Sequence, residues 1–361
     1  MNNLFIMRTQ YNLIIAVGIL KEMYPNDKND LILLPEFKVS NQFLTAIGAV
    51  FSSVTVLPNE KSKKRFEIEK LLYQQLKQAK HLEKNHYDNV FISQDQFFET
   101  TFMSKLFRKN RFETCFIEED CYFSLIPERN FGHPDYEKVF KVKPISFNVK
   151  IRNFARERMY GRDIFTCGPT AFYGENENIR TICALYPHML RSEISDKETL
   201  SVTPEMILNG TRLIYSNIEI NLEKHDKYLF FLADLIDRYK NIELIEQALG
   251  QLVDYCKKNG RKFLYKYHPR ETKELKALEN DFCVRLPTVI PSERILSELY
   301  SNDVVTISTF SQSLQVACRL GFKTISLANI NYSAHSWAEK AMKNMGILLP
   351  DNIEDITKQL V

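Results

Sequence analysis

Short apolar runs typical of β-strands alternate with helical patterns over most of this 361-residue chain. Strands that alternate with helices of ten or more residues indicate βαβ units and a parallel sheet. The first 120 residues predict strands at Leu4–Arg8, Asp30–Leu34, Val54–Leu57, Asn89–Ser93 and Thr114–Glu119, and helices at Tyr11–Met23, Asn41–Phe51, around 68–79 and at Gln96–Phe107. This half is expected to form a Rossmann-like domain, but it lacks the GxGxxG fingerprint, so no dinucleotide is implied.

The alternation resumes after a different middle region. Residues 121–195 are punctuated by prolines and predict irregular structure over the carboxyl edge of the sheet, and the polar stretch Ser192–Lys224 is expected to hold the domain connection. The second half predicts strands at Lys227–Leu232, Lys262–Tyr267, Val304–Ser308 and Thr324–Ala328, and helices at Leu244–Lys258, Ser311–Leu320 and Trp337–Met345.

The pattern as a whole predicts an α/β protein with two Rossmann-like domains, at residues 1–200 and 201–361. Two such domains that face a cleft form the GT-B arrangement. Ligands of open α/β sheets lie at the carboxyl ends of the strands, so candidate sites are expected there.

Composition excludes several classes of protein. No apolar run reaches the roughly 18 residues that span a bilayer, and no cleavable signal pattern opens the chain. Seven cysteines, none in a CxxC pair, indicate reduced thiols and no zinc site. A net charge of +3 gives no support to a nucleic-acid partner. We therefore expect a cytoplasmic two-domain enzyme.

The first candidate site is the acidic triplet Glu118-Glu119-Asp120, which directly follows an apolar strand. Crowded carboxylates raise the pKa of at least one of their number, and such a group is suited to act as a general base. The alternative interpretation is a solvated acidic turn.

The second candidate site is His268-Pro269, at the end of an apolar-alternating strand and flanked by Lys266 and Arg270. Proline disfavours helical geometry in the residue before it, so the histidine is expected at the strand tip. A cationic imidazole between basic neighbours would bind a phosphate and donate a proton to it. The alternative is a surface loop with a chance His-Pro, as at His133-Pro134.

The third candidate site is a run of hydroxyl residues between a strand and a helix, which includes Ser308, Thr309 and Ser311. Hydroxyls and free backbone N–H groups at a helix N-terminus form an anion site. Ordinary N-capping is the alternative explanation. The order of the three motifs is more specific than any one of them.

In this order the motifs resemble those of the bacterial GT-B sialyltransferases, especially the capsular polysialyltransferases and the lipooligosaccharide sialyltransferases. Those enzymes carry an acidic pair followed by glycine, an HP motif within K-x-HPR/K-E, and a Ser/Thr-rich motif before a helix. The opening Leu4–Gln10 also resembles their first strand and loop. One departure is Asp120, which stands where the family has its glycine.

The resemblance implies an inverting, metal-independent transfer of sialic acid, or a related nonulosonic acid, from its CMP donor to a glycan hydroxyl. It implies no cofactor, and it places the general base, Glu118 or Glu119, in an acceptor-side first domain. In the CMP-binding second domain His268 would stabilise or protonate the leaving phosphate. The implied donor-binding residues are Lys266, Pro269, Arg270, Glu293, Ser308, Thr309 and Ser311. Glu293 would hold the ribose hydroxyls, although an acid at a helix start explains it equally well.

Two other functions stay open. A GT-B transferase with another CMP- or CDP-activated donor, such as Kdo or a polyol, would need the same phosphate-reading motifs. A non-catalytic relative that binds a nucleotide or glycan would accommodate Asp120.

Basic clusters at 61–65, 105–111 and 152–162 could bind an anionic acceptor or the inner-membrane surface, because anionic lipids attract Lys and Arg. For the first cluster a solvated helix face is the preferred interpretation. The third, Arg152-Arg156-Arg158-Arg162, is the better candidate for substrate or peripheral membrane contact.

Overall fold

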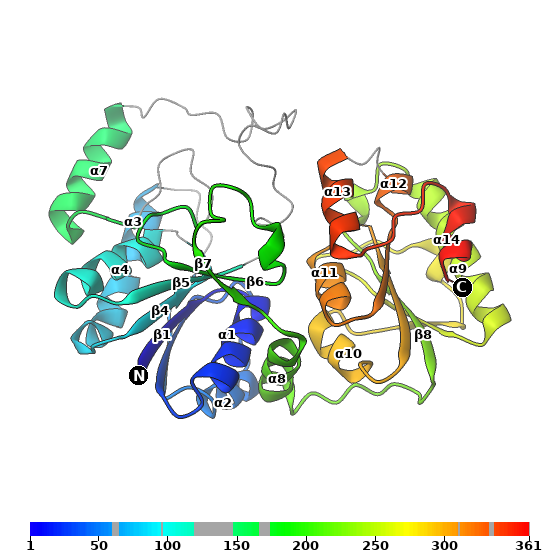
Figure 1. Ribbon diagram of the computed structural model, residues 1–361, viewed down its shortest axis with the longest axis horizontal. Coiled ribbons are helices and arrows are strands. Elements are labelled where there is room, and N and C mark those ends of the chain that lie inside the picture. The colour runs from blue at the N-terminus through cyan, green and yellow to red at the C-terminus, as the bar shows by residue number, and fades with distance from the viewer. Residues whose placement is uncertain are drawn as a thin grey trace. The chain divides into compact units, whose positions relative to one another are not determined.

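The computed structural model describes residues 1–59, 65–94, 97–118, 147–165, 174–309, 311–331 and 336–360 (Figure 1). The chain divides into two compact units, Met1–Asn217 and Ile218–Val361. Each unit is an α/β structure built on its own parallel sheet.

The described strands of the first unit form a seven-stranded sheet in the order β3-β2-β1-β4-β5-β6-β7, and every pair in it is parallel. The chain first builds outward from β1 to β3 and then returns to β4 on the other side of β1. The carboxyl ends of β1 and β4 therefore form the topological switch point, where such sheets place ligands. The strands are β1 Asn2–Met7, β2 Lys28–Leu33, β3 Ser53–Val56, β4 Asn89–Ile92, β5 Glu113–Ile117, β6 Thr181–Ala184 and β7 Glu198–Ser201.

Helices cover both faces of this sheet. Leu4 and Ile6 of β1 lie in a core with buried side chains of α3 and α4, whereas the alternate side chain Phe5 stacks on Phe91 and faces the other way. Tyr24, directly after α1, contacts Phe91 on that second face. The helices are α1 Gln10–Met23, α2 Asn41–Gly48, α3 Arg65–Ala79, α4 Phe97–Lys109, α7 Phe147–Tyr160 and α8 Pro204–Tyr215.

Helix α8 belongs to the first unit because it crosses α1 at two glycines. A Cβ atom on Gly18 would lie 2.2 Å from the carbonyl oxygen of Met206, and one on Gly210 would lie 2.0 Å from that of Ile14. Only residues without a side chain allow the two backbones this close. The unit boundary consequently falls after Asn217, and not after residue 200.

We expect the Gly210→Ala change to destabilise the first unit by about 1–3 kcal/mol, because the added methyl group must push the two helices apart. The matched control is Gly250→Ala in the second unit, where nothing lies within 4 Å of the added Cβ. That change should stabilise its helix by about 0.5–1 kcal/mol. Urea unfolding followed by circular dichroism measures both, and equal effects of the two changes would contradict the close crossing.

The second unit has a five-stranded sheet in the order β10-β9-β8-β11-β12, and its described strand pairs are all parallel. Its switch point lies between β8 and β11. The strands are β8 Lys227–Leu232, β9 Lys262–Lys266, β10 Cys283–Arg285, β11 Asp303–Ser308 and β12 Lys323–Ser326. The helices are α9 Ile242–Asn259, α10 Ser292–Glu298, α11 Gln312–Arg319, α12 Ala328–Asn331, α13 Ser336–Met345 and α14 Ile353–Leu360.

Two sequence predictions were wrong about the middle of the chain. The region expected to be irregular contains α7 and the strand β6, whose run of four residues is too short to show a period. The polar stretch expected to be a connection contains β7 and α8. Thr203, which accepts a hydrogen bond from the N–H of Met206, and Pro204 at the first helical position are the start signal that was missed.

The five cysteines in the described residues are free thiols, and Cys121 and Cys167 lie outside them. No helix in the described part of the chain is both long and apolar enough to cross a membrane.

Candidate functional site

The carboxyl edge of the second sheet brings most of the predicted donor-binding residues together. Lys266 of β9 pairs with Leu232 of β8, which pairs with Ser308 of β11. Residues paired in register point to the same face, so Lys266 and Ser308 share one face two strands, or about 10 Å, apart. His268 and Thr309 follow directly at this edge.

His268 is held in one orientation by its own loop. The imidazole Nδ1 accepts a hydrogen bond from the backbone N–H of Arg270, at 3.1 Å. That contact requires Nδ1 to be unprotonated, so the proton of the neutral ring is on Nε2. The ring is half-buried and presents an Nε2–H donor.

The cationic imidazole expected from the sequence is not the form of the ligand-free protein. Burial lowers the pKa of His268 below its ordinary value, and Arg270 lowers it further. Asp234 opposes this shift, and Lys266 and Arg238 reinforce it. The basic neighbours that were expected to accompany a charged histidine instead disfavour its charge, so the ring is neutral at pH 7. A phosphate dianion beside the ring would raise the pKa of His268 and favour its charged form.

Lys266 and Glu293 are two buried residues whose charges interact without direct contact. Burial lowers the pKa of Lys266, which Glu293 partly offsets, and burial raises the pKa of Glu293, which its own backbone N–H and Lys266 partly offset. Lys266 Nζ lies 3.4 Å from the carbonyl oxygen of Tyr267. Within the described residues no ion pair of 4.0 Å or less joins the lysine to the glutamate. Both groups therefore retain capacity for a polar ligand.

The three predicted hydroxyl residues have three different environments. Ser308 is buried and donates to the carbonyl oxygen of Leu232 at 2.7 Å, which ties β11 to β8. Ser311 accepts from the N–H of Leu314 and is the N-cap of α11, as the alternative interpretation had it. Thr309 is fully buried, and its Oγ1 has no hydrogen-bond partner in the described structure. An orphaned buried hydroxyl next to a helix N-terminus fits a ligand anion.

The rest of the His268 loop is fixed by Glu271. Its carboxylate accepts hydrogen bonds from the backbone N–H groups of Ile236, Thr272 and Lys273, at 2.6–2.8 Å. Burial alone would raise the pKa of Glu271, but these three bonds lower it. Pro269 and Arg270 are exposed between His268 and this anchor.

Asp234 is a site residue that the sequence analysis missed. It follows β8 at the switch point and is buried, and its Oδ1 forms an ion pair with Arg238 Nη1 at 3.3 Å. Its charge raises the pKa of His268. The signal was present, since an acid directly after the apolar strand Lys227–Leu232 and Ala233 is the same pattern that singled out Glu118.

In the first unit, Glu118 lies directly after β5 and is buried. Its Oε2 accepts the backbone N–H of Leu185 at 2.9 Å, and its own N–H donates to the carbonyl oxygen of Cys183. The side chain thus joins β5 to the segment that follows β6. Glu119 and Asp120 lie outside the described residues.

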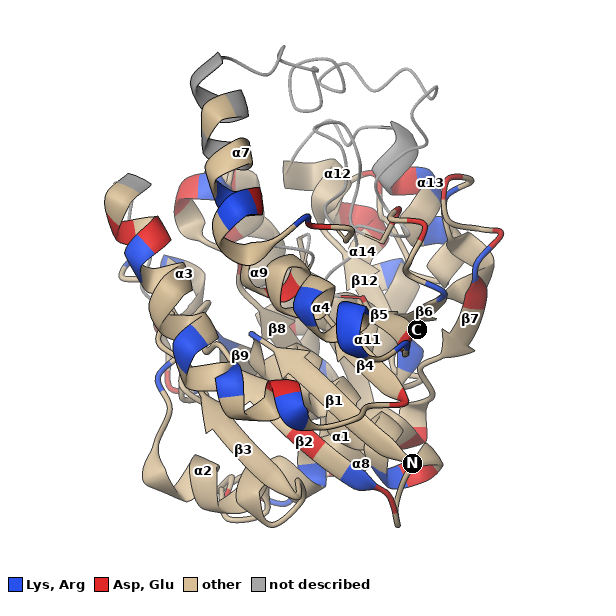
Figure 2. Ribbon diagram, turned by 90° about the vertical axis from the view of Figure 1, so that its left-hand side faces the viewer, with Lys and Arg blue, Asp and Glu red and all other residues tan. Residues whose placement is uncertain are grey.

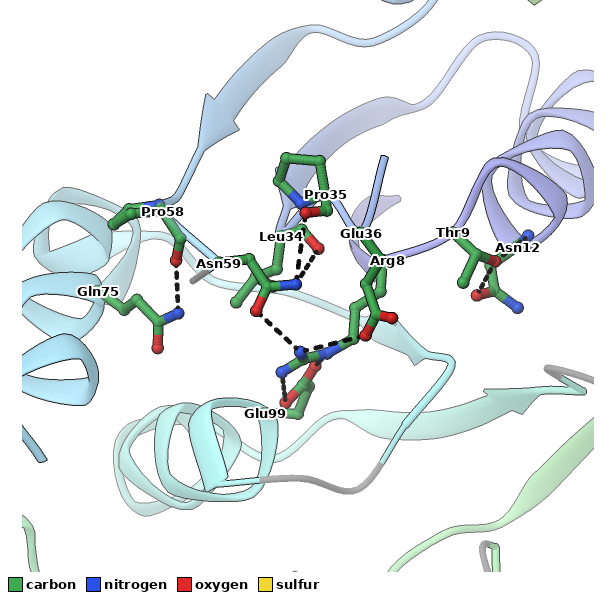
Figure 3. A network of polar contacts seen from close by, with 10 residues as sticks. All are labelled: Arg8, Thr9, Asn12, Leu34, Pro35, Glu36, Pro58, Asn59, Gln75 and Glu99. Atoms are coloured by element: carbon green, nitrogen blue, oxygen red, sulfur yellow. Dashed lines mark hydrogen bonds and ion pairs between the residues drawn. The ribbon is translucent and has the colours of Figure 1, made fainter. Parts of the chain in front are cut away.

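A polar network occupies the carboxyl ends of β1, β2 and β3 in the same unit (Figure 3). Arg8 Nε and Nη2 donate to the two carboxylate oxygens of Glu99 in α4, at 2.5 and 2.9 Å, and both residues are buried. Arg8 Nη1 lies 3.5 Å from Asn59 Oδ1 and 3.9 Å from Glu36 Oε1. The Asn59 amide donates to the carbonyl oxygen of Leu34. The network fixes the turns that follow three strands.

Several side chains of the predicted basic clusters have partners within the first unit. Arg156 forms an ion pair with Glu69 of α3, Lys109 forms one with Glu83, and Arg111 lies over the ring of Phe107. The side chain of Arg152 and residues 61–64 lie outside what the structure describes. Among the described residues no group of three or more His, Cys, Asp or Glu could hold a metal ion.

Comparisons with known proteins match the fold but not the sequence. No family model matches the chain, and no curated protein matches it. An alpha/beta-galactoside alpha-2,3-sialyltransferase from the luminous marine bacterium Photobacterium phosphoreum is similar over 98% of each chain, with a TM-score of 0.56 and 11% identity. A UDP-GlcNAc 2-epimerase from Neisseria meningitidis, bound to UDP-GlcNAc, is similar over 100% of this chain and 90% of its own, with a TM-score of 0.54 and 11% identity.

A further UDP-N-acetylglucosamine 2-epimerase is similar over 100% of this chain and 87% of its own, with a TM-score of 0.55 and 12% identity. At these identities the likeness establishes the fold alone. The chain has the GT-B type of fold, which confirms the predicted class of two Rossmann-like domains.

Proposed function

We propose that the protein is an inverting, metal-independent glycosyltransferase that moves sialic acid, or a related nonulosonic acid, from its CMP donor to a glycan hydroxyl. The observation that carries the proposal is the state of His268. Its Nδ1 is engaged by the Arg270 N–H, so its Nε2–H is the group presented at the ligand edge of the second sheet. A fixed single donor of this kind is suited to the phosphate of a leaving CMP.

On the donor side the proposed phosphate site has three parts. His268 donates from Nε2, the orphaned hydroxyl of Thr309 donates to a second oxygen, and the N-terminus of α11, capped by Ser311, contributes its dipole. As the sugar–phosphate bond breaks, negative charge grows on the phosphate, and the hydrogen bond that His268 Nε2–H donates to it strengthens. The neutral ring keeps its proton and stabilises the leaving phosphate as a hydrogen-bond donor, which suits an oxocarbenium-like transition state.

Lys266 and Glu293 are proposed to hold the ribose of the donor. A hydroxyl between them can accept from the ammonium group and donate to the carboxylate, which replaces the water that each buried charge has lost. Arg270 is exposed beside His268 and adds positive potential, and Pro269 keeps the histidine extended.

On the acceptor side we assign the general base to Glu119 and a positioning role to Glu118. The Oε2 atom of Glu118 accepts the Leu185 N–H and joins β5 to the segment that follows β6, which is a positioning contact. Its neighbour Glu119 directly follows this fixed point in the sequence. The proposed setting is the cytoplasm, where the protein would contribute to capsule or lipooligosaccharide synthesis.

The test is to incubate the full chain with CMP-sialic acid and a lactoside or oligosialoside, with excess chelator, and to follow CMP release and acceptor mass. We expect transfer to persist with chelator and to fall about 10²–10⁴-fold in Glu119→Gln, because removal of a placed base typically costs that much. Glu118→Gln keeps the shape of the Leu185 contact and should retain more activity.

Three outcomes would contradict parts of this proposal. CMP release from CMP-Kdo with none from CMP-sialic acid would point to the other-donor alternative. Nucleotide binding without turnover of any donor would point to a non-catalytic relative. Activity that chelator abolishes and magnesium restores would exclude the metal-free mechanism.

A further inference from the structure

Three helices on one side of the first unit carry a strong net positive charge. Helices α3, α4 and α7 contain ten Lys and Arg residues and four Glu residues, which gives them a formal charge of +6, whereas the whole chain has +3. Figure 2 shows the three helices in front of the sheet, with the Lys and Arg residues of their described parts in blue. The rest of the chain is therefore net negative, and the positive charge is local.

Large apolar side chains are exposed on the same helices. Phe66 and Tyr73 of α3 are 80% and 57% exposed, and Ile151, Phe154 and Met159 of α7 are 52%, 59% and 62% exposed. Scattered exposed apolar residues are ordinary, but five on two adjacent helices form a cluster. In the described residues of the second unit the most exposed apolar residue, Val289 at 81%, lies in a loop.

The apolar and basic residues alternate along each helix at helical spacing. Phe66, Lys70, Tyr73 and Lys77 follow one another at i, i+4, i+7 and i+11, and all four are exposed. On α7, Ile151, Phe154 and Arg158 follow at i, i+3 and i+7. We call these residues, together with Met159, the α3–α7 surface.

Two contacts join α7 to α3 and α4. Arg156 of α7 forms an ion pair with Glu69 of α3, with a closest distance of 2.5 Å. Lys105 of α4 lies over the ring of Tyr160 in α7, 5.5 Å from its centroid. Arg156 and Tyr160 are half-buried and lie on the side of α7 away from Ile151 and Phe154. Ile151 and Phe154 therefore lie on the outward side of α7, next to Arg158.

We propose that the α3–α7 surface docks the protein on an anionic lipid bilayer. Apolar side chains interleaved with Lys and Arg match the headgroup region, where the rings enter the acyl boundary and the cations contact lipid phosphates. A partner protein that buried the same surface would have to pair Lys70, Lys77 and Arg158 one by one. An anionic bilayer supplies mobile charges that adjust to all of them.

Sedimentation with vesicles tests the proposal on the full chain. We expect binding to phosphatidylcholine vesicles that contain about 30% phosphatidylglycerol. Binding to vesicles of pure phosphatidylcholine, or to the mixed vesicles in about 0.5 M salt, should be at least about tenfold weaker. The double variant Phe66→Ser/Phe154→Ser and the double variant Lys70→Glu/Arg158→Glu should each weaken binding at least about tenfold. Val289→Ser and Lys224→Glu, at exposed positions of the second unit, are the matched controls and should bind as the unchanged protein does.

Several results would overturn the inference. Absence of vesicle binding, equal binding to both lipid compositions, or equal loss in the control variants would each do so. Size-exclusion chromatography with light scattering adds a fourth: a dimer that Phe66→Ser/Phe154→Ser dissociates, with no vesicle binding, would assign the surface to a second copy. The surface contains none of the proposed catalytic residues, so sialyl transfer and vesicle binding can fail independently.

Discussion

His268→Ala lowers sialyl transfer by about 10²–10⁴-fold while leaving the unfolding transition of the second unit nearly unchanged, if the proposed function is correct. The ring is half-buried, and its one hydrogen bond in the described structure is the Nδ1 contact with the Arg270 N–H. The loop keeps its shape without the ring, because Glu271 binds three backbone N–H groups beside it. The loss should therefore appear in turnover and not in folding.

The pH dependence of CMP binding separates a phosphate contact from a merely structural role. In the empty protein the pKa of His268 lies below its ordinary value, and a bound phosphate dianion raises it. Binding then takes up a proton between the two pKa values, so affinity increases as pH falls through that interval and levels off below it. The phosphate of CMP has its own second ionisation near pH 6, which also makes affinity depend on pH. The pH profile of the His268→Ala protein gives this contribution of CMP alone. Calorimetry that finds the same pH profile in both proteins would contradict the contact.

His225 provides a matched control for the histidine change. Its Nδ1 accepts the backbone N–H of Lys227 at 3.1 Å, the same contact that His268 makes with Arg270. His225 precedes β8, however, and so lies at the opposite edge of the sheet from the proposed site. His225→Ala should leave both transfer and CMP affinity unchanged, and a comparable loss there would remove the case for His268.

The sequence predicted which residues lie together at the carboxyl edge of the second sheet, but not their protonation states or hydrogen bonds. Parallel strands bring their carboxyl ends to one edge, so strand endings alone were enough to group Lys266, His268, Ser308 and Thr309. Charge states depend on burial and on neighbours from other strands, which spacing does not reveal. Asp234, a strand away, could be recognised as a neighbour of His268 only once β8 was known to lie beside β9.

The fold was predictable where strands and helices were long and regular. Helix α8 was missed because its polar side resembles a connection, while its apolar side packs on α1 through glycines that no periodicity marks. Arg8 and Glu99 are 91 positions apart, and their pairing follows from the return of β4 to the side of β1. Contacts of this kind come from topology, and sequence patterns become informative about them only after the strand order is known.

Arg8→Ala should destabilise the first unit by about 3–5 kcal/mol, one of the largest effects of a single change in this protein. The carboxylate of Glu99 is 0% exposed and would lose the two charge-assisted bonds that neutralise it. Removing one partner of a buried ion pair costs about this much, because the remaining charge is buried without compensation. Asn59 and Glu36 at the ends of β3 and β2 would also lose their contacts with the guanidinium.

The double change Arg8→Met/Glu99→Met separates the cost of an unpaired charge from the value of the pair itself. Replacing both charges by apolar side chains of similar volume is often neutral, so most of the stability lost in Arg8→Ala should return. Circular dichroism follows both units, whereas fluorescence of the chain's one Trp, Trp337 in α13, follows the second unit. We expect only the transition of the first unit to move. A double variant no more stable than Arg8→Ala would mean that the pair, and not the stranded carboxylate, stabilises the turns at the switch point.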